Sequence, residues 1–292
     1  MVRTGSTPDR LSRRRSLRQG GAGVNPPGLS RVLIDVLAHI RVWLGVGALA
    51  LPLACGGAVL ASASVSASSA AAKPLAGKIV GIDPGHNGRN WTDPAFLNRQ
   101  VWNGREWEDC DTTGTETAGG YTEAKFNWNV ATYLRADLSK EGAKVVLTRQ
   151  SNNGIGPCVN RRARILDNAH ANVSIDIHAD YAPASGRGFT ILEPVADTVN
   201  KKVVKPSLRF ATDVHAAMLT HTAVPISDYY GRNGYIRRDD LAGLNLTTMP
   251  KVLIECGNMN NRADAAMLVR PKVQQNIAKA LAAAITRFLT AK

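Results

Sequence analysis

Short apolar runs rich in β-branched residues alternate with longer stretches of helical periodicity from about residue 77 to the end of this 292-residue chain. Strands separated by helices indicate a largely parallel sheet covered by helices on both faces. We therefore expect a single α/β domain built on a mostly parallel, twisted sheet. The expected strands are Lys78–Asp83, Lys144–Thr148, Val173–Ile177, Gly188–Leu192 and Lys251–Glu255, and the expected helices are residues 123–140, 158–169, Pro206–Thr220 and Lys272–Leu289.

The helix expected over residues 123–140 has recognisable ends. Thr122 is a residue type that caps helix N-termini, and Gly142 is typical of a helix C-terminus. Apolar side chains recur between them at helical spacing, namely Phe126, Val130, Tyr133, Leu134 and Leu138.

Residues 1–70 have the composition of a leader. They combine a basic stretch, an uncharged apolar run over residues 42–60 and small residues such as Ala61–Ala63, an order typical of a secretory signal. The alternative is a membrane anchor, because the run is nearly long enough to span a bilayer, but Pro52 and several glycines weaken it. We expect a disordered basic leader plus signal segment over residues 1–70 and a folded domain over residues 71–292. The mature protein would act in the periplasm, the cell wall or the extracellular space, without stable membrane association.

The net charge of the chain limits the classes of partner that it suits. The chain has 36 Lys and Arg against 23 Asp and Glu, and residues 1–70 hold eight Arg and two Asp of these, so the remainder carries about +7. Such a domain suits an anionic partner. No Lys- or Arg-rich helix with base-reading residues is present, nor basic stretches interleaved with aromatic residues, so we expect no nucleic acid among its partners.

Four polar residues gather where the expected strands and one helix begin or end. His86 follows the first strand, His178 the third and Glu255 ends the Lys251 strand, while Glu123 opens a helix. In open α/β sheets, ligands bind beyond the carboxyl ends of the strands, so these side chains should meet at one edge. Two imidazoles and a carboxylate form a ligand set for catalytic zinc with an open position for water, and a second carboxylate can move protons.

Each of the four residues has a simpler interpretation. His86 could cap a turn, His178 could be a hydrogen-bonded core histidine, and Glu123 could favour the helix dipole. A purely structural role is harder to assign to Glu255, because burying a carboxylate in an apolar strand costs free energy unless it is paired or bound to a metal.

Export makes disulfides possible among the cysteines that remain after the signal. Cys110 and Cys158 lie in polar, Gly-rich loops, whereas Cys256 lies in an apolar strand. We expect a Cys110–Cys158 bridge, with Cys256 as a buried thiol; three free thiols are the alternative. Closing this loop would stabilise the fold by roughly 4 kcal/mol in the chain-entropy description.

The motifs resemble those of the zinc-dependent N-acetylmuramoyl-L-alanine amidases of bacterial cell-wall turnover, in the order in which that family has them. The resemblance rests on Asp83–Gly88, Glu123 at a helix start, Ser174–Asp180 and Leu253–Asn261. It extends from about Gly77 to Leu289 and is greatest for the small exported amidases of mycobacteria and other actinobacteria. That group also has cysteines in the two loops that hold Cys110 and Cys158.

The resemblance implies a function and assigns roles. His86, Glu123 and His178 would bind one Zn²⁺ per chain, and Glu255 would be the catalytic carboxylate. Residues 71–292 would form a catalytic domain that cleaves the amide between N-acetylmuramic acid and L-alanine in peptidoglycan or muropeptide fragments. We expect a monomer, and no residues identify the substrate-binding site.

A long loop over residues 87–120 separates the first two expected ligands and contains Trp91, Trp102 and Trp107. These aromatic side chains could stack on sugar or peptide, or could pack within a loop held by the disulfide. Two other functions remain open. The chain could be another exported zinc hydrolase, such as a peptidase or deacetylase, or a catalytically inactive wall-binding protein, which would be expected to lack Glu255.

Overall fold

A computed structural model describes residues 72–291 and shows one six-stranded sheet with the strand order β4-β1-β5-β8-β6-β7. Four of the five neighbouring strand pairs are parallel, and only β6 and β8 run antiparallel. The mostly parallel α/β sheet expected from the sequence is confirmed. Its strands are β1 (Ile79–Pro84), β4 (Lys144–Leu147), β5 (Val173–Asp180), β6 (Thr190–Pro194), β7 (Tyr235–Arg238) and β8 (Lys251–Asn258).

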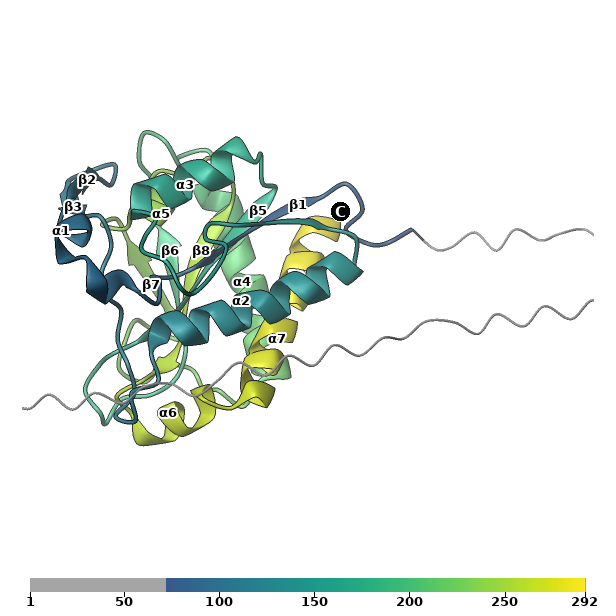
Figure 1. The fold of residues 1–292 in the computed structure, drawn as a ribbon. Helices are drawn as coiled ribbons and strands as arrows, with labels where there is room; N and C mark the ends of the chain where they lie inside the picture. Colours follow the sequence, from purple (N-terminus) through teal and green to yellow (C-terminus); the bar gives the residue numbers. More distant parts are fainter. Residues whose placement is uncertain (1–71, 292) are drawn as a thin grey trace, which may run out of the picture. The chain divides into compact units, whose positions relative to one another are not determined.

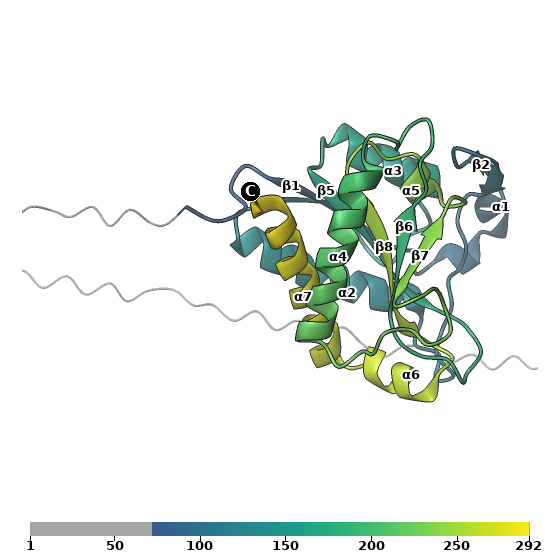
Figure 2. The same ribbon diagram turned by 180° about the vertical axis from the view of Figure 1, so that it is seen from behind.

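Helices cover both faces of the sheet (Figures 1 and 2). On one face α7 packs against both α2 and α4, and on the other α3 packs against α5. Strand β1 shows the two faces directly, because Val80 belongs to the large core cluster under the long helices whereas Ile79 packs with Leu166 of α3. The five helices are α2 (Glu123–Lys140), α3 (Val159–Asn168), α4 (Val204–His221), α5 (Ala242–Asn245) and α7 (Pro271–Thr290).

Helix α2 begins and ends where its sequence predicts. The hydroxyl of Thr122 accepts a hydrogen bond from the Lys125 N–H at 3.4 Å, and Gly142 adopts a positive φ of 95° just beyond the last turn. Phe126 and Leu134 are among its fully buried side chains. Each large apolar side chain of this kind stabilises the fold by about 1.5–3 kcal/mol on burial.

The Cys110–Cys158 disulfide is present and Cys256 is a buried thiol, as expected. Cys158 stands at the start of α3, and the backbone carbonyl of Cys110 accepts a hydrogen bond from Val159 N–H at 2.8 Å. The bridge therefore joins the long loop after β1 to the start of α3.

Short elements are the part of the fold that sequence patterns did not reveal. They are η1 (Asn90–Thr92), α1 (Pro94–Leu97), β2 (Gln100–Trp102), β3 (Trp107–Asp109) and α6 (Arg262–Leu268), together with β7 and α5. The strand expected over Gly188–Leu192 lies two residues later, as β6. Elements of three to seven residues complete too few periods to give a clear pattern.

The leader predicted over residues 1–70 lies outside the described residues. Within residues 72–291, none of the helices combines the length and apolar character needed to cross a bilayer.

Candidate functional site

The carboxyl ends of β1, β5 and β8 bring the predicted site residues together. His178 of β5 lies directly beside Glu255 of β8 in the sheet register, and His86 follows β1. Glu123 reaches the same place from the first turn of α2. All four side chains line one hollow of about 260 Å³. None of the four side chains therefore stands apart from the others.

His86, Glu123 and His178 form a compact group of potential metal ligands. One ligand atom from each residue lies within 4.8 Å of those of the other two. His86 Nε2 is 3.2 Å from Glu123 Oε2, and His178 Nδ1 is 2.8 Å from Glu123 Oε1. No second group of His, Cys, Asp and Glu within residues 72–291 meets the same criterion. The donor set, two imidazoles and one carboxylate, fits a divalent transition metal.

The electrostatic surroundings of His86 and Glu123 also favour the binding of a cation. Burial lowers the pKa of His86, but the Glu123 carboxylate and a hydrogen bond with Asp111 outweigh it and raise the pKa to about 10. Burial raises the pKa of Glu123, and the two histidines bring it well below its usual value. A buried carboxylate that attracts a proton onto its neighbours will also attract a metal ion.

Backbone and amide donors hold Glu123 in place. Thr115 N–H donates to Oε2 at 3.0 Å, and Ala179 N–H and the Asn127 side chain both donate to Oε1 at 3.3 Å. These contacts orient the carboxylate toward the two histidines. Glu123 therefore does more than favour the dipole of α2.

Two glycines make room for the ligand side chains. A Cβ on Gly85 would lie 2.1 Å from the His178 ring. A Cβ on Gly114 would lie 2.7 Å from the ring of His86, and the positive φ of Gly114, 71°, favours glycine as well. His86 itself has a φ of 55°, unusual for a residue with a side chain, so the local backbone is constrained at the site.

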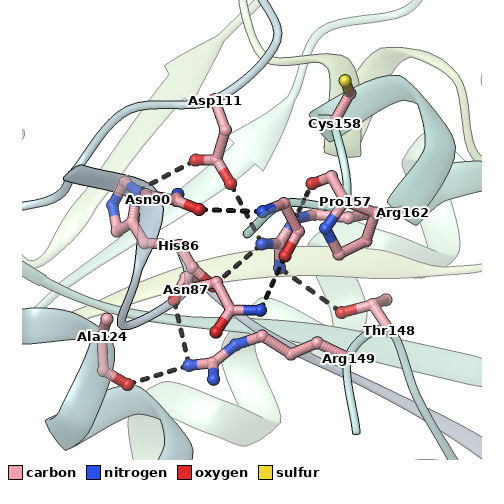
Figure 3. Close-up of polar contacts among 12 residues, drawn as sticks. His86, Asn87, Asn90, Asp111, Ala124, Thr148, Arg149, Pro157, Cys158 and Arg162 are labelled. Atoms are coloured by element: carbon pink, nitrogen blue, oxygen red, sulfur yellow. Dashed lines mark hydrogen bonds and ion pairs between the residues drawn. The ribbon is translucent and has the colours of Figure 1, made fainter. Parts of the chain in front are cut away.

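Asp111 and Arg162 fix the position of His86 through hydrogen bonds (Figure 3). His86 Nδ1 has two acceptors, Asp111 Oδ1 at 3.1 Å and the Thr112 carbonyl at 3.2 Å, so Nδ1 carries a hydrogen and Nε2 is the ring nitrogen that faces Glu123 and could bind a metal. Arg162 donates to Asp111 Oδ2 at 3.1 Å and to the His86 carbonyl at 2.9 Å. Asp111 adjoins Cys110, so the disulfide holds it near the start of α3.

Arg149 links the end of β1 to the start of α2 (Figure 3). Its guanidinium donates to the Pro84 carbonyl at 2.9 Å and to the Ala124 carbonyl at 2.8 Å. The backbone segments that carry His86 and Glu123 are thereby joined through one buried side chain.

Glu255 differs from Glu123 in having few partners. Its Oε2 atom is buried without a hydrogen-bond partner. Burial first, and then the charge of Glu123, raises the pKa of Glu255 well above its usual value. The next residue, Cys256, packs in the main core, so its side chain faces away from the hollow, as the alternation of a strand requires.

Comparison with known proteins agrees with the motifs. The sequence model of the N-acetylmuramoyl-L-alanine amidase family (Amidase_3) matches residues 80–287. The chain belongs to this family. It is 40% identical over 236 residues to N-acetylmuramoyl-L-alanine amidase Rv3717 of Mycobacterium tuberculosis, a match that covers 80% of this chain and 96% of that protein.

Solved structures of amidases share the fold. The N-acetylmuramyl-L-alanine amidase Ami1 of Mycobacterium smegmatis superposes with a TM-score of 0.70 at 37% identity, covering 75% of this chain and 99% of that one. The apo form of Ami1 from Mycobacterium abscessus gives a TM-score of 0.70 at 38% identity, covering 74% of this chain and 100% of that one.

Three residues that hold the candidate site of this amidase-family chain in place could not be identified from the sequence. Asp111, Arg149 and Arg162 gave no signal of their own; the position of Asp111 beside Cys110 is the one local clue. Asp176 of β5 forms a buried ion pair with Lys251 at 2.7 Å.

The three tryptophans of the loop over residues 87–120 divide into two groups. Trp102 of β2 and Trp107 of β3 stack edge to face, with ring centroids 5.8 Å apart. Trp91 is 69% exposed and lines a separate groove. Trp102 and Trp107 therefore pack on each other within the loop, whereas Trp91 is left exposed beside the groove.

Proposed function

We propose that this chain hydrolyses the amide between the lactyl group of N-acetylmuramic acid and L-alanine in peptidoglycan, with one zinc ion held by His86, Glu123 and His178. Residues 71–292 would form the catalytic domain. The observation that carries the proposal is the convergence of these ligand atoms to within 4.8 Å beside Glu255. We infer the identity of the scissile bond from membership of the N-acetylmuramoyl-L-alanine amidase family.

Zinc, when bound, would supply Lewis-acid activation of the amide carbonyl and of the attacking water. Glu123 and the two histidines would fix its position, and the hydrogen bond from His86 Nδ1 to Asp111 would keep Nε2 available as a ligand. Glu255 would take a proton from the attacking water and return it to the nitrogen of L-alanine as the carbon–nitrogen bond breaks. The products would be a free lactyl carboxylate on the sugar and a peptide that begins with L-alanine.

Digestion of a defined muropeptide, followed by mass analysis, tests this proposal. We expect masses for the free muramic acid fragment and for a stem peptide with a new L-alanine amino terminus. Treatment with a chelator should stop the reaction, and zinc should restore it. Fragments cut within the stem peptide would instead identify a peptidase, and loss of acetyl groups would identify a deacetylase.

The substrate also suggests where the protein works. Peptidoglycan lies outside the cytoplasmic membrane, so we infer action at the cell wall, after export directed by residues 1–70. Fractionation of cells expressing a tagged full-length chain tests this step. A tagged protein of unprocessed mass in the cytoplasm would contradict it.

A further inference from the structure

A second hollow opens beside the catalytic residues. It measures about 680 Å³ and shares Gly114, Thr115 and Tyr181 with the hollow that contains Glu255. A ligand lying in this groove would therefore reach the reacting bond without leaving the protein surface.

The lining of the groove is aromatic and uncharged except at one position. The rings of Trp91 and Tyr181 are 69% and 59% exposed. Thr113 and Thr115 add hydroxyl groups to the lining of the groove and Asn260 adds an amide, and Glu116 is its one carboxylate. Aromatic faces with neighbouring hydroxyl and amide groups suit a neutral sugar, which offers C–H faces for stacking and hydroxyl groups for hydrogen bonds.

The residues that present these groups are held by the fold. Asn90, fully buried beside Trp91, donates to the Thr112 carbonyl at 2.7 Å and accepts from Gly156 N–H at 2.8 Å. Asn260, which also lines the groove, donates to the Ala182 carbonyl at 2.9 Å. The groove therefore exists before a ligand arrives, which reduces the entropy lost on binding.

The cavity on the other side of the two histidines has a different character. It measures about 330 Å³, and apolar residues such as Leu241 and Leu253 line it together with Asp111 and Arg162, which pair with each other. In a peptide-bearing strand the lactyl carboxyl of muramic acid is already an amide, so the glycan is uncharged, whereas the stem peptide carries ionised groups.

We propose that the groove lined by Trp91 and Tyr181 binds the glycan strand of the substrate, with a sugar ring stacked on Trp91. This inference rests on the proposed function. It makes the groove a specificity site: the enzyme would distinguish the same amide bond with and without its sugars.

Kinetics on two substrates that share the scissile bond test the proposal. One is a GlcNAc–MurNAc peptide, and the other is the same peptide carrying only an N-terminal lactyl group. We expect Trp91→Ala to lower kcat/KM about tenfold on the sugar-bearing substrate, mainly through KM, because a stacking contact is worth on the order of 1 kcal/mol. Trp91→Ala should cut the lactyl peptide at the wild-type rate. Trp91→Tyr should retain most of the wild-type kcat/KM on the sugar-bearing substrate. Trp107→Ala is the matched control, because Trp107 is 66% exposed but stacks on Trp102 away from the groove.

An equal loss on both substrates, or an equal effect of Trp107→Ala, would overturn the proposal. Binding of a peptide-free GlcNAc–MurNAc oligosaccharide whose lactyl carboxyls are capped as primary amides, measured by calorimetry, separates this outcome from failure of the proposed function. Binding that Trp91→Ala weakens supports the glycan site even if no substrate is cut. Failure of the wild-type protein to bind the oligosaccharide refutes the glycan site even if the amide is hydrolysed.

Discussion

At the scale of single residues, the contrast between Glu123 and Glu255 explains how two carboxylates in one hollow can have different roles. Glu123 accepts three hydrogen bonds and faces two histidines, which favours its charged form. Glu255 has a buried oxygen with no partner and a neighbouring negative charge, which favours its protonated form. Different surroundings thus suit the two carboxylates to their proposed roles, Glu123 in holding a cation and Glu255 in exchanging a proton.

Replacement of Glu255 by Gln or Ala should separate metal binding from turnover. The three proposed ligands remain, so zinc content after dialysis should equal that of the wild type. The rate of muropeptide hydrolysis should fall by about 10²–10⁴-fold, the range typical of general acid–base catalysis. Near-wild-type turnover in either variant would remove Glu255 from the mechanism.

Asp111 acts on the proposed metal site through His86. Asp111→Ala leaves His86 Nδ1 without its carboxylate partner and leaves Arg162 with one buried anion fewer. We expect zinc affinity, measured by competition with a chromophoric chelator, to fall about 10–100-fold. Asp137→Ala, on the exposed side of α2, is the control and should leave affinity unchanged. An Asp111→Ala protein with normal folding and wild-type zinc affinity would show that Asp111 does not position His86.

At the scale of elements, the loop between β1 and α2 forms much of one wall of the site. It supplies Asp111, Thr115 and Trp91, yet it contains only short helices and strands. Buried side chains and the disulfide with Cys158 hold it to α3. Loops placed on a rigid sheet in this way commonly carry the functional residues of α/β folds.

Loss of the disulfide should therefore destabilise this loop and the whole domain. Cys110→Ser should lower the free energy of unfolding by roughly 4 kcal/mol, the chain-entropy value for a loop of 48 residues. Urea denaturation of the oxidised wild type and the variant measures the difference. Cys158→Ser and the double variant should show the same loss, because each removes the same bridge; additive losses would argue for separate packing effects.

At the scale of the whole molecule, buried ion pairs link the stability of the domain to pH. Burial raises the pKa of Asp111, but the Arg162 guanidinium and the hydrogen bond from His86 prevail and lower it from 3.8 to about 2. Because the folded-state pKa lies below the unfolded-state value, Asp111 contributes stability that is fully present above pH 4 and is lost as pH falls toward 2.

Unfolding of chelator-treated protein at pH 4.5 and pH 2 tests this contribution. The free energy of unfolding should fall by roughly 2 kcal/mol more for the wild type than for Asp111→Asn between these two pH values, since one pKa unit corresponds to about 1.4 kcal/mol. Equal losses in the two proteins would show that Asp111 is not ionised against Arg162 in the folded state.

Local patterns in the sequence predicted much of this arrangement. Runs of β-branched residues identified the buried strands, and Thr122 and Gly142 marked the ends of α2. His86, His178 and Glu255 could be assigned to one edge because strand ends in a parallel sheet converge there by topology. The cysteines could be paired because one lay in an apolar strand and two in polar loops.

The sequence by itself thus determined the type of sheet, the edge that carries the candidate site and the four residues that meet there. Only the tertiary structure decided that β6 runs antiparallel to β8, that Arg162 reaches Asp111 across 51 residues, and that Trp91 separates from Trp102 and Trp107. The physical reason is range. Burial and helix capping act over a few residues, whereas the partner of a buried charge or an exposed ring depends on where distant segments lie once the whole chain has packed.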